Sequence, residues 1–133
     1  MVDGSFDPLH EGHIEYFKSA AELGLPILCN IASDSWTRQK HPVLLEQSRR
    51  AIVLDSIRYI SFVLVGCDST LIALEAVKPK VFAKGRDWLD RGGLPSEELD
   101  ICARLEIDVK FFDSVRNSSS AILGEFNSQR DRQ

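Results

Sequence analysis

The sequence predicts an α/β protein, a three-layer sandwich in which a parallel sheet of about five strands carries helices on both faces. Short apolar segments of strand type alternate along the chain with longer segments whose apolar residues recur at helical spacing. Strands joined through helices pair in parallel by right-handed crossovers, which leaves helices on both sides of the sheet. The 133 residues, 44% hydrophobic and 27% charged, suit a single soluble domain.

The first part of the chain contributes two of these strands. Residues 1–3 form the end of a strand that is unusually short. Residues 11–23 form a helix, because their apolar side chains fall on one face and Gly24 is a natural helix stop. The run at 26–32, PILCNIA, is mostly apolar, as in strands that are buried on both faces. A polar loop at 33–44 follows it.

The rest of the chain repeats the alternation. We expect, in order, a helix at 45–57, a strand at 61–65, a helix at 69–77, a strand at 80–83, a helix at 96–105, a strand at 107–112 and a helix at 118–126. Ser96 is placed to cap the helix that it opens. We assign residues 1–126 to one domain and residues 127–133 to a polar, frayed tail. The arrangement is Rossmann-like, so ligands are expected beyond the carboxyl ends of the strands.

Composition and charge argue against several classes of protein. The net charge of −4 disfavours a nucleic-acid partner, and no apolar run approaches the ~18 residues needed to cross a membrane. The first residues lack the features of a signal peptide, so we expect a cytoplasmic protein whose three widely spaced cysteines are reduced and buried. Basic residues nevertheless concentrate at 36–50 and 78–91, which suits a compact anionic ligand such as a polyphosphate.

The strongest functional signal is the segment 4–13, GSFDPLHEGH, which joins the first strand to the first helix. Gly4 permits a sharp turn and the close approach of a ligand. His10 and His13 are three residues apart and share one face of the first helical turn, while Gly12 leaves room for a phosphate at the helix N-terminus. Two imidazole donors and a helix end can stabilise the charge that develops at an attacked phosphate. The alternative is that the histidines serve as a helix cap and a core residue.

This segment resembles the G-x-F-D-x-x-H-x-G-H signature of the cytidylyltransferase-like nucleotidyltransferases, and the chain resembles glycerol-3-phosphate cytidylyltransferase and the adenylyl-transferring domain of ADP-heptose synthase within that family. Residues 50–59, RAIVLDSIRY, are similar to a helix whose arginine contacts the nucleotide. Residues 83–88, AKGRDW, resemble the K-G-x-D-[YW] loop, and residues 117–122, NSSSAI, resemble an S-[ST]-[ST]-x-I segment. The order and spacing of the four segments imply one nucleotidyltransferase domain over 1–126.

The resemblance implies a role for each matching residue. His10 and His13 would bind the triphosphate and stabilise the transition state, and Lys40 would approach the phosphates, a task that Arg38 could also perform. Nucleotide contacts are implied for Gly4, Ser5, Phe6, Gly12, Arg50, Lys84, Gly85, Asp87, Trp88, Ser118, Ser119 and Ser120.

The implied reaction transfers CMP, favoured narrowly, or AMP from CTP or ATP to a sugar phosphate, polyol phosphate or similar molecule, with release of pyrophosphate. The acceptor phosphate is already anionic near neutral pH, so no general base is needed. Mg²⁺ would enter with the triphosphate, held mainly by phosphate oxygens, with Asp7 as the nearest protein candidate. Arg86 and Arg116, together with Arg91, are expected near the acceptor phosphate. The resemblance also implies a homodimer.

Other interpretations stay open at this stage. A non-catalytic nucleotide-binding regulator could use the same fold. Leu123 stands where pantetheine-phosphate and nicotinamide-mononucleotide adenylyltransferases carry an arginine, which disfavours those activities. Only three residues precede Gly4, which is compatible with a shortened first strand or with a longer natural chain. Trp88 could be a core residue, Arg50 a surface charge and Ser119 only a helix cap.

Overall fold

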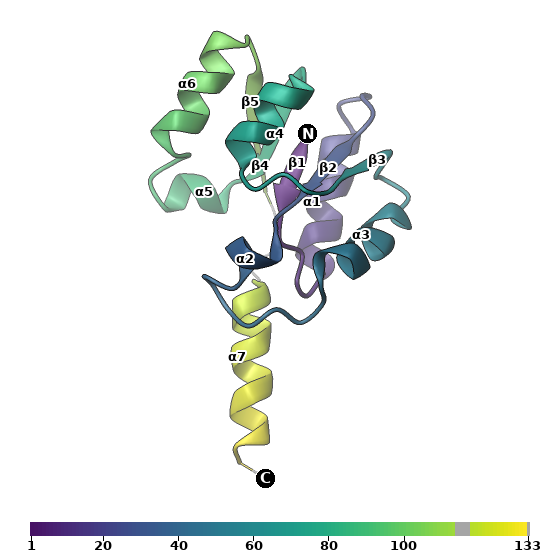
Figure 1. Ribbon diagram of the computed structural model, residues 1–133, viewed down its shortest axis with the longest axis vertical. Helices are drawn as coiled ribbons and strands as arrows, with labels where there is room; N and C mark the ends of the chain where they lie inside the picture. Colours follow the sequence, from purple (N-terminus) through teal and green to yellow (C-terminus); the bar gives the residue numbers. More distant parts are fainter. Residues whose placement is uncertain (114–117, 133) are drawn as a thin grey trace.

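The computed structural model describes residues 1–113 and 118–132, and within them strands and helices alternate as the sequence predicts (Figure 1). The elements in order are β1 (Val2–Gly4), α1 (Glu11–Ala21), β2 (Leu28–Ile31), α2 (Asp34–Thr37), α3 (Gln47–Asp55), β3 (Phe62–Leu64), α4 (Thr70–Val77), β4 (Val81–Gly85), α5 (Asp87–Asp90), α6 (Ser96–Arg104), β5 (Asp108–Phe112) and α7 (Ser119–Arg130).

The strands form a parallel sheet whose order reverses at β1. β1 pairs with β2 and β2 with β3, while β4 pairs with β5, all in parallel. β1 and β4 join the two groups, because the Ala83 N–H donates to the Met1 carbonyl at 2.9 Å and the Met1 amine donates to the Val81 carbonyl at 2.6 Å. The order is therefore β3-β2-β1-β4-β5. The strand order reverses between the neighbours β1 and β4, because the chain crosses from β3 at one edge to β4 on the other side of β1. Ligands of such sheets bind at that switch, beyond the carboxyl ends of the strands.

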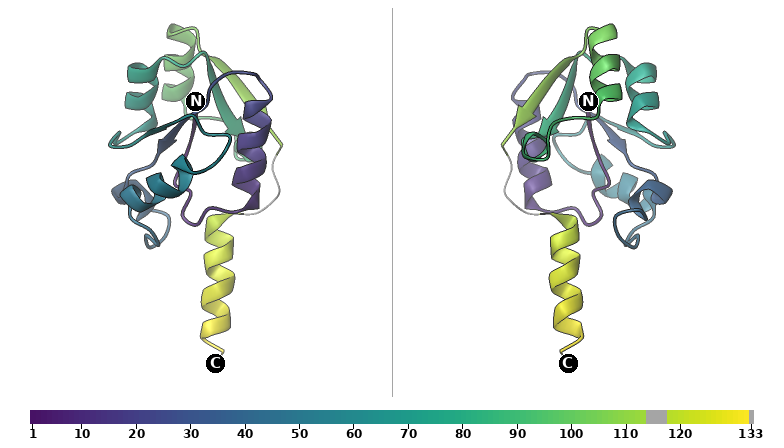
Figure 2. Two further views of the ribbon diagram at one scale, coloured as in Figure 1. Left: turned by 90° about the vertical axis from the view of Figure 1, so that its right-hand side faces the viewer. Right: turned by 90° about the vertical axis from the view of Figure 1, so that its left-hand side faces the viewer.

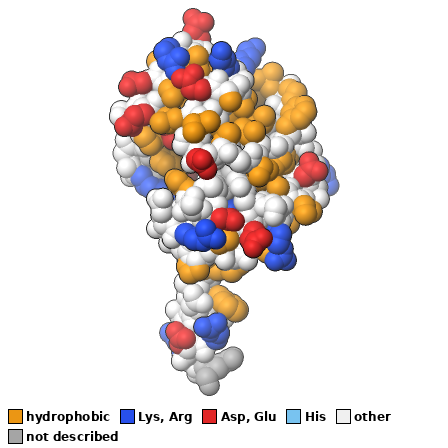
Figure 3. All heavy atoms as spheres, in the orientation of Figure 1, with side chains coloured by type: hydrophobic (Ala, Val, Ile, Leu, Met, Phe, Trp, Pro, Cys, Tyr) orange, Lys and Arg blue, Asp and Glu red, His pale blue; other side chains and the backbone are white. Residues whose placement is uncertain are grey.

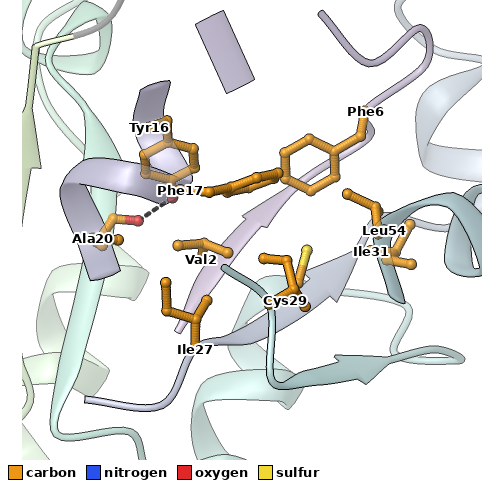
Figure 4. Packing of buried hydrophobic residues seen from close by; sticks show 11 residues of the cluster. Val2, Phe6, Tyr16, Phe17, Ala20, Ile27, Cys29, Ile31 and Leu54 are labelled. Carbon is orange, nitrogen blue, oxygen red and sulfur yellow. Dashed lines mark hydrogen bonds between the residues drawn. The ribbon is translucent and has the colours of Figure 1, made fainter. Parts of the chain in front are cut away.

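Two apolar clusters hold helices to the two faces of this sheet. One packs α1 and α3 against the strands through buried residues that include Val2, Phe17, Cys29 and Leu54 (Figure 4). The other packs α4 and α6 against the opposite face and includes Ala73, Leu74, Phe82, Cys102 and Ile107. Burial of these side chains on both faces supplies the main driving force for folding. The expected three-layer arrangement is confirmed.

The loops are more structured than the sequence predicts. The short helices α2 and α5 lie inside the segments expected to be irregular, and the Ser33 hydroxyl caps α2 by accepting a hydrogen bond from the Trp36 N–H at 3.2 Å. The expectation that Ser96 caps α6 was wrong. Ser96 is the first helical residue, and Pro95 precedes it without a side-chain cap. None of the described helices is long and apolar enough to cross a membrane.

The last helix differs most from the expectation. α7 continues to Arg130 instead of ending at residue 126, so residues 127–130 are helical rather than frayed, in keeping with helix formers such as Gln129. None of its residues is buried, and it extends away from the rest of the molecule (Figures 1 and 2). Acidic and basic side chains are interspersed over the face shown in Figure 3.

Candidate active site

A cavity of about 1,110 Å³, here called the first cavity, opens at the carboxyl ends of β1 and β4. It is where the strand order predicts a ligand. The residues predicted from the sequence that line it are Ser5, Phe6, His10, Gly12, His13, Lys40, Lys84, Gly85, Arg86, Asp87, Trp88, Arg91, Ser118, Ser119 and Ser120. The structure therefore brings together segments that are up to 115 residues apart, from Ser5 to Ser120. Arg116 lies outside the described residues.

The two histidines form a capping box at the start of α1. The Nδ1 of His10, the N-cap residue, accepts a hydrogen bond from the Gly12 N–H at 3.1 Å, and the Nδ1 of His13 accepts one from the His10 N–H at 3.2 Å. The rings stack with centroids 3.7 Å apart. Because both Nδ1 atoms act as acceptors, the neutral rings carry their protons on Nε2. The cap and the functional interpretation are thus compatible, since capping leaves each Nε2–H for a ligand.

Burial keeps these imidazoles neutral. It lowers the pKa of His13 to about 3, an effect that His10 strengthens and the Glu11 carboxylate opposes. Burial also lowers the pKa of His10, again against Glu11. A nearby polyphosphate would favour the charged forms and raise both pKa values. In the absence of an anion, the two imidazoles are therefore neutral N–H donors, and binding of an anion would favour their protonation.

Phe6 supports the loop that carries the histidines. Its ring packs against the His13 ring with centroids 5.0 Å apart. Phe6 is buried and has a φ of 52°. Its ring lies 3.0 Å from where a Cβ on Gly4 would stand, so the glycine is needed for this packing. Phe6 therefore supports the histidine, although it also borders the first cavity.

Arg50 and Asp7 differ from their expected roles. Neither lines the first cavity, and both are fully buried. The Arg50 guanidinium donates to the carbonyls of Ser5, Ala32 and Leu45 and forms an ion pair with Asp34 at 2.6 Å. The Asp7 carboxylate accepts hydrogen bonds from the backbone N–H groups of residues 44 and 45 at 2.7 and 2.9 Å. These two residues fix the loops to each other, and their nucleotide and magnesium roles stay predictions.

Three cations stand on one wall of the first cavity. The Lys84 ammonium forms an ion pair with Asp3 at 2.6 Å and lies 4.4 Å from the centre of the Trp88 ring, which Arg91 also approaches at 5.2 Å. Lys40 lies 3.9 Å from the Trp36 ring centre. Burial lowers the pKa of Lys40, and Arg91 and Lys84 lower it further, which an anion bound among them would reverse. The wall is therefore suited to phosphate.

The start of α7 forms a second helix N-terminus at this cavity. Ser118 is its N-cap, since its hydroxyl accepts a hydrogen bond from the Ala121 N–H at 3.1 Å. The Ser119 hydroxyl instead donates to the Pro8 carbonyl at 2.8 Å and so ties α7 to the histidine loop. The alternative that Ser119 is only a cap was wrong. Backbone N–H groups at both helix starts favour anions.

A second cavity of about 370 Å³ adjoins the first and shares Asp3, Lys40, Lys84, Trp88 and Arg91 with it. Further residues lining it include Gly4, Asn30, Ser33, Trp36, Asp68, Ser69, Thr70, Glu97 and Glu98. Sequence reasoning missed most of them. The signal that it could have used was Asn30, a polar residue within the apolar strand β2.

The expected acceptor and metal residues receive less support. Arg86 lines the first cavity but forms an exposed ion pair with Asp113 at 2.7 Å. Asp87 is paired with Arg91. Among the described residues there is no group of three or more His, Cys, Asp or Glu side chains placed to hold a metal ion.

Comparisons with known proteins show which family the chain resembles. The family model described as cytidylyltransferase-like matches residues 1–122. The chain is similar to the bifunctional protein HldE of Pelobacter propionicus, with 36% identity over 136 residues, which is 96% of this chain and 27% of that protein. HldE of Helicobacter acinonychis is 34% identical over 102 residues, 73% of this chain and 22% of that protein. The chain spans about a quarter of the length of these relatives.

Solved structures share the fold. The lipopolysaccharide core biosynthesis protein from Thermoplasma volcanium matches with a TM-score of 0.71 and 25% identity, covering 89% of this chain and 96% of that one. A protein of unknown function from Archaeoglobus fulgidus matches with a TM-score of 0.60 and 20% identity, covering 85% of this chain and 98% of that one. Both confirm the parallel α/β architecture.

Proposed function

The chain belongs to the cytidylyltransferase-like family, and on that premise we propose that it is a nucleotidyltransferase, which moves a nucleoside monophosphate from a nucleoside triphosphate to a phosphorylated small molecule and releases pyrophosphate. The observation that carries the proposal is the first cavity. Its lining includes two neutral histidines with protons on Nε2, two helix N-termini and the wall formed by Lys40, Lys84 and Arg91.

In the proposed reaction, an oxygen of the acceptor phosphate attacks the α-phosphorus of the triphosphate. A new P–O bond forms there, the bond to the β-phosphate oxygen breaks, and pyrophosphate leaves with that electron pair. His10, His13 and Lys40 would stabilise the charge on the α-phosphate oxygens. The start of α7, with Ser119 and Ser120, would hold the departing phosphates. No residue needs to remove a proton, because the attacking phosphate is already anionic.

The relatives change the preference for the nucleotide. The matched HldE proteins correspond to the ADP-heptose synthase resemblance seen in the sequence, so we place ATP ahead of CTP, which reverses the order taken from the sequence. The acceptor is proposed to sit in the second cavity with its phosphate against Lys40, Lys84 and Arg91, because those side chains border both cavities. Magnesium, bound by phosphate oxygens, stays a prediction, as does the homodimer.

The test is pyrophosphate release with each triphosphate and a panel of phosphorylated acceptors in the presence of magnesium. We expect release that requires one triphosphate and one class of acceptor, and that is lost in His13→Ala. If a triphosphate raises the melting temperature but no acceptor gives pyrophosphate, either the acceptor lies outside the panel or the protein is a nucleotide-binding regulator. If no triphosphate binds, the proposal is wrong.

A further inference from the structure

The buried polar atoms that lack a protein partner mark the walls of the two cavities. Among the described residues, three buried side-chain atoms have no hydrogen-bond partner, namely His10 Nε2, Asn30 Oδ1 and Glu98 Oε2. His10 lines the first cavity, and Asn30 and Glu98 line the second. Buried polar groups without partners are rare and costly in folded proteins, so each of these atoms marks a place where a hydrogen-bonding group can be bound. The second cavity therefore presents two unsatisfied hydrogen-bond acceptors.

Asn30 is an exception within its strand. It is 4% exposed and lies in β2 between Cys29 and Ile31, which are both completely buried. The backbone pairing places it opposite Asp3 of β1 and Leu64 of β3. An apolar residue would suit the interior of a parallel sheet better. Its amide thus has no structural explanation among the contacts of the strand, and it faces the second cavity.

Glu98 approaches the same cavity from α6. Its side chain is half-buried, and burial raises its pKa, an effect that Asp3 and Glu97 strengthen and Lys84 opposes. None of the hydroxyls along the cavity wall donates a hydrogen bond to its buried Oε2 atom. Those of Ser33 and Ser69 accept hydrogen bonds from backbone N–H groups at helix starts, and that of Thr70 donates to Asp3 at 2.8 Å. Among the described residues that line this cavity, the buried acceptors without a partner are Asn30 Oδ1 and Glu98 Oε2.

The ligand groups that suit these acceptors are hydroxyls. A cationic amine is another donor that carboxylates attract, and it would use the faces of Trp36 and Trp88 as an aromatic cage. Those rings are already approached by the protein's own cations, Lys40 on the first and Lys84 with Arg91 on the second. A second positive charge would be repelled there, whereas neutral hydroxyl groups would not.

We propose that Asn30 and Glu98 are specificity-determining residues that accept hydrogen bonds from hydroxyl groups of the phosphorylated acceptor, whose phosphate lies against Lys40, Lys84 and Arg91. This inference rests on the proposed function, because it takes the second cavity as the acceptor site. Its volume of about 370 Å³ is at the lower end of small-molecule sites, roughly 300–1,000 Å³, and admits an acceptor of sugar size. Such an acceptor carries hydroxyls on several carbons, so it can reach β2 and α6 together.

The test measures binding of matched phosphate monoesters by calorimetry, using the full chain. The probes are a set of hexose phosphates, propyl phosphate and ethanolamine phosphate, and the variants are Glu98→Ala and Asn30→Ala. We expect at least one hexose phosphate to bind more tightly than the other two probes. Each substitution should weaken that binding about tenfold or more and leave propyl phosphate unchanged. Asp100→Ala is the control, because Asp100 is exposed on the same helix and lines neither cavity.

The inference is overturned if propyl or ethanolamine phosphate binds as tightly as every hexose phosphate, or if Glu98→Ala weakens all probes equally. If Asn30→Ala lowers the melting temperature, the test relies on Glu98→Ala, because Glu98 is only half-buried and its removal disturbs the fold less. Pyrophosphate release separates this inference from the proposed function. If binding depends on the hydroxyls but no triphosphate gives pyrophosphate release, only the proposed transfer reaction is contradicted. If the rate of pyrophosphate release is equal in wild type and Glu98→Ala, only the specificity role is contradicted.

Discussion

Two helix N-termini face the first cavity, and they are held in different ways. The start of α1 is fixed by the histidine capping box, by the packing of Phe6, and by the Arg50 and Asp7 contacts that join the loops behind it. The start of α7 is joined to the histidine loop through the Ser119 hydroxyl, and none of the residues of α7 is buried. In the proposed reaction the rigid start stabilises the attacked phosphate, while the lightly held start binds the leaving group.

The largest effect on the rate of pyrophosphate release should come from a substitution at the start of α1. His13→Ala removes one neutral donor and one half of the capping box, and loss of a single donor to a developing oxyanion costs about 100- to 1,000-fold in rate. We expect pyrophosphate release to fall by that factor, while loss of this capping contact lowers the free energy of unfolding by only about 1 kcal/mol. A fall of less than about tenfold would show that α1 does not stabilise the reacting phosphate.

The loops behind α1 can be tested through stability. Arg50→Ala removes four contacts and leaves Asp34 and three carbonyls without their donor, which should lower the free energy of unfolding by about 3 kcal/mol. Urea unfolding measures the loss. Arg49→Ala is the matched control, since Arg49 is its exposed neighbour and should change stability by less than about 0.5 kcal/mol. Equal effects of the two substitutions would contradict the buried role of Arg50.

The neutral state of His13 predicts a pH dependence. Its pKa in the folded protein is about 3, below the usual 6.5, so the unfolded chain binds an additional proton between these values. The stability that goes with the depressed pKa is present above pH 6.5 and is lost as the pH falls toward 3. Urea unfolding at a series of pH values should show this decline, and His13→Asn should make it shallower. An unchanged slope in the variant would mean that His13 is protonated in the fold.

The smallest effect is expected from a substitution at the start of α7. Ser119→Ala removes the hydrogen bond to Pro8, worth about 1 kcal/mol, which corresponds to roughly a fivefold higher KM for the triphosphate. Global stability should hardly change, because α7 is exposed. Ser128→Ala serves as the control, since its hydroxyl bonds only to the Gly124 carbonyl of the same helix. An identical KM in both variants would show that the tie between α7 and the histidine loop is not used.

The sequence predicted what local patterns determine. Alternating segments specified the parallel sheet, and the spacing of His10 and His13 predicted the helix start at which they lie. It could not show which charged side chains are buried. Arg50 and Asp7 belong to segments that resemble binding motifs, yet the fold encloses both, and no pattern in the chain distinguishes an enclosed charge from an exposed one. Asn30 and Glu98 are 68 positions apart, and only the packing of α6 beside the sheet brings them to one cavity.

The two tryptophans give this molecule a built-in optical reporter. Trp36 and Trp88 are the only tryptophans of the sequence, and both line the second cavity, whereas only Trp88 also lines the first. Indole emission responds to displaced water and to nearby charge, so filling either cavity should change the intrinsic fluorescence of the unlabelled protein. A Trp88→Phe variant would leave Trp36 as a single fluorophore at the second cavity. Its emission would then follow occupancy of that cavity and, through Lys40, which lies 3.9 Å from its ring centre, the binding of an anion in the first cavity. Titrating each substrate separately would distinguish the two responses.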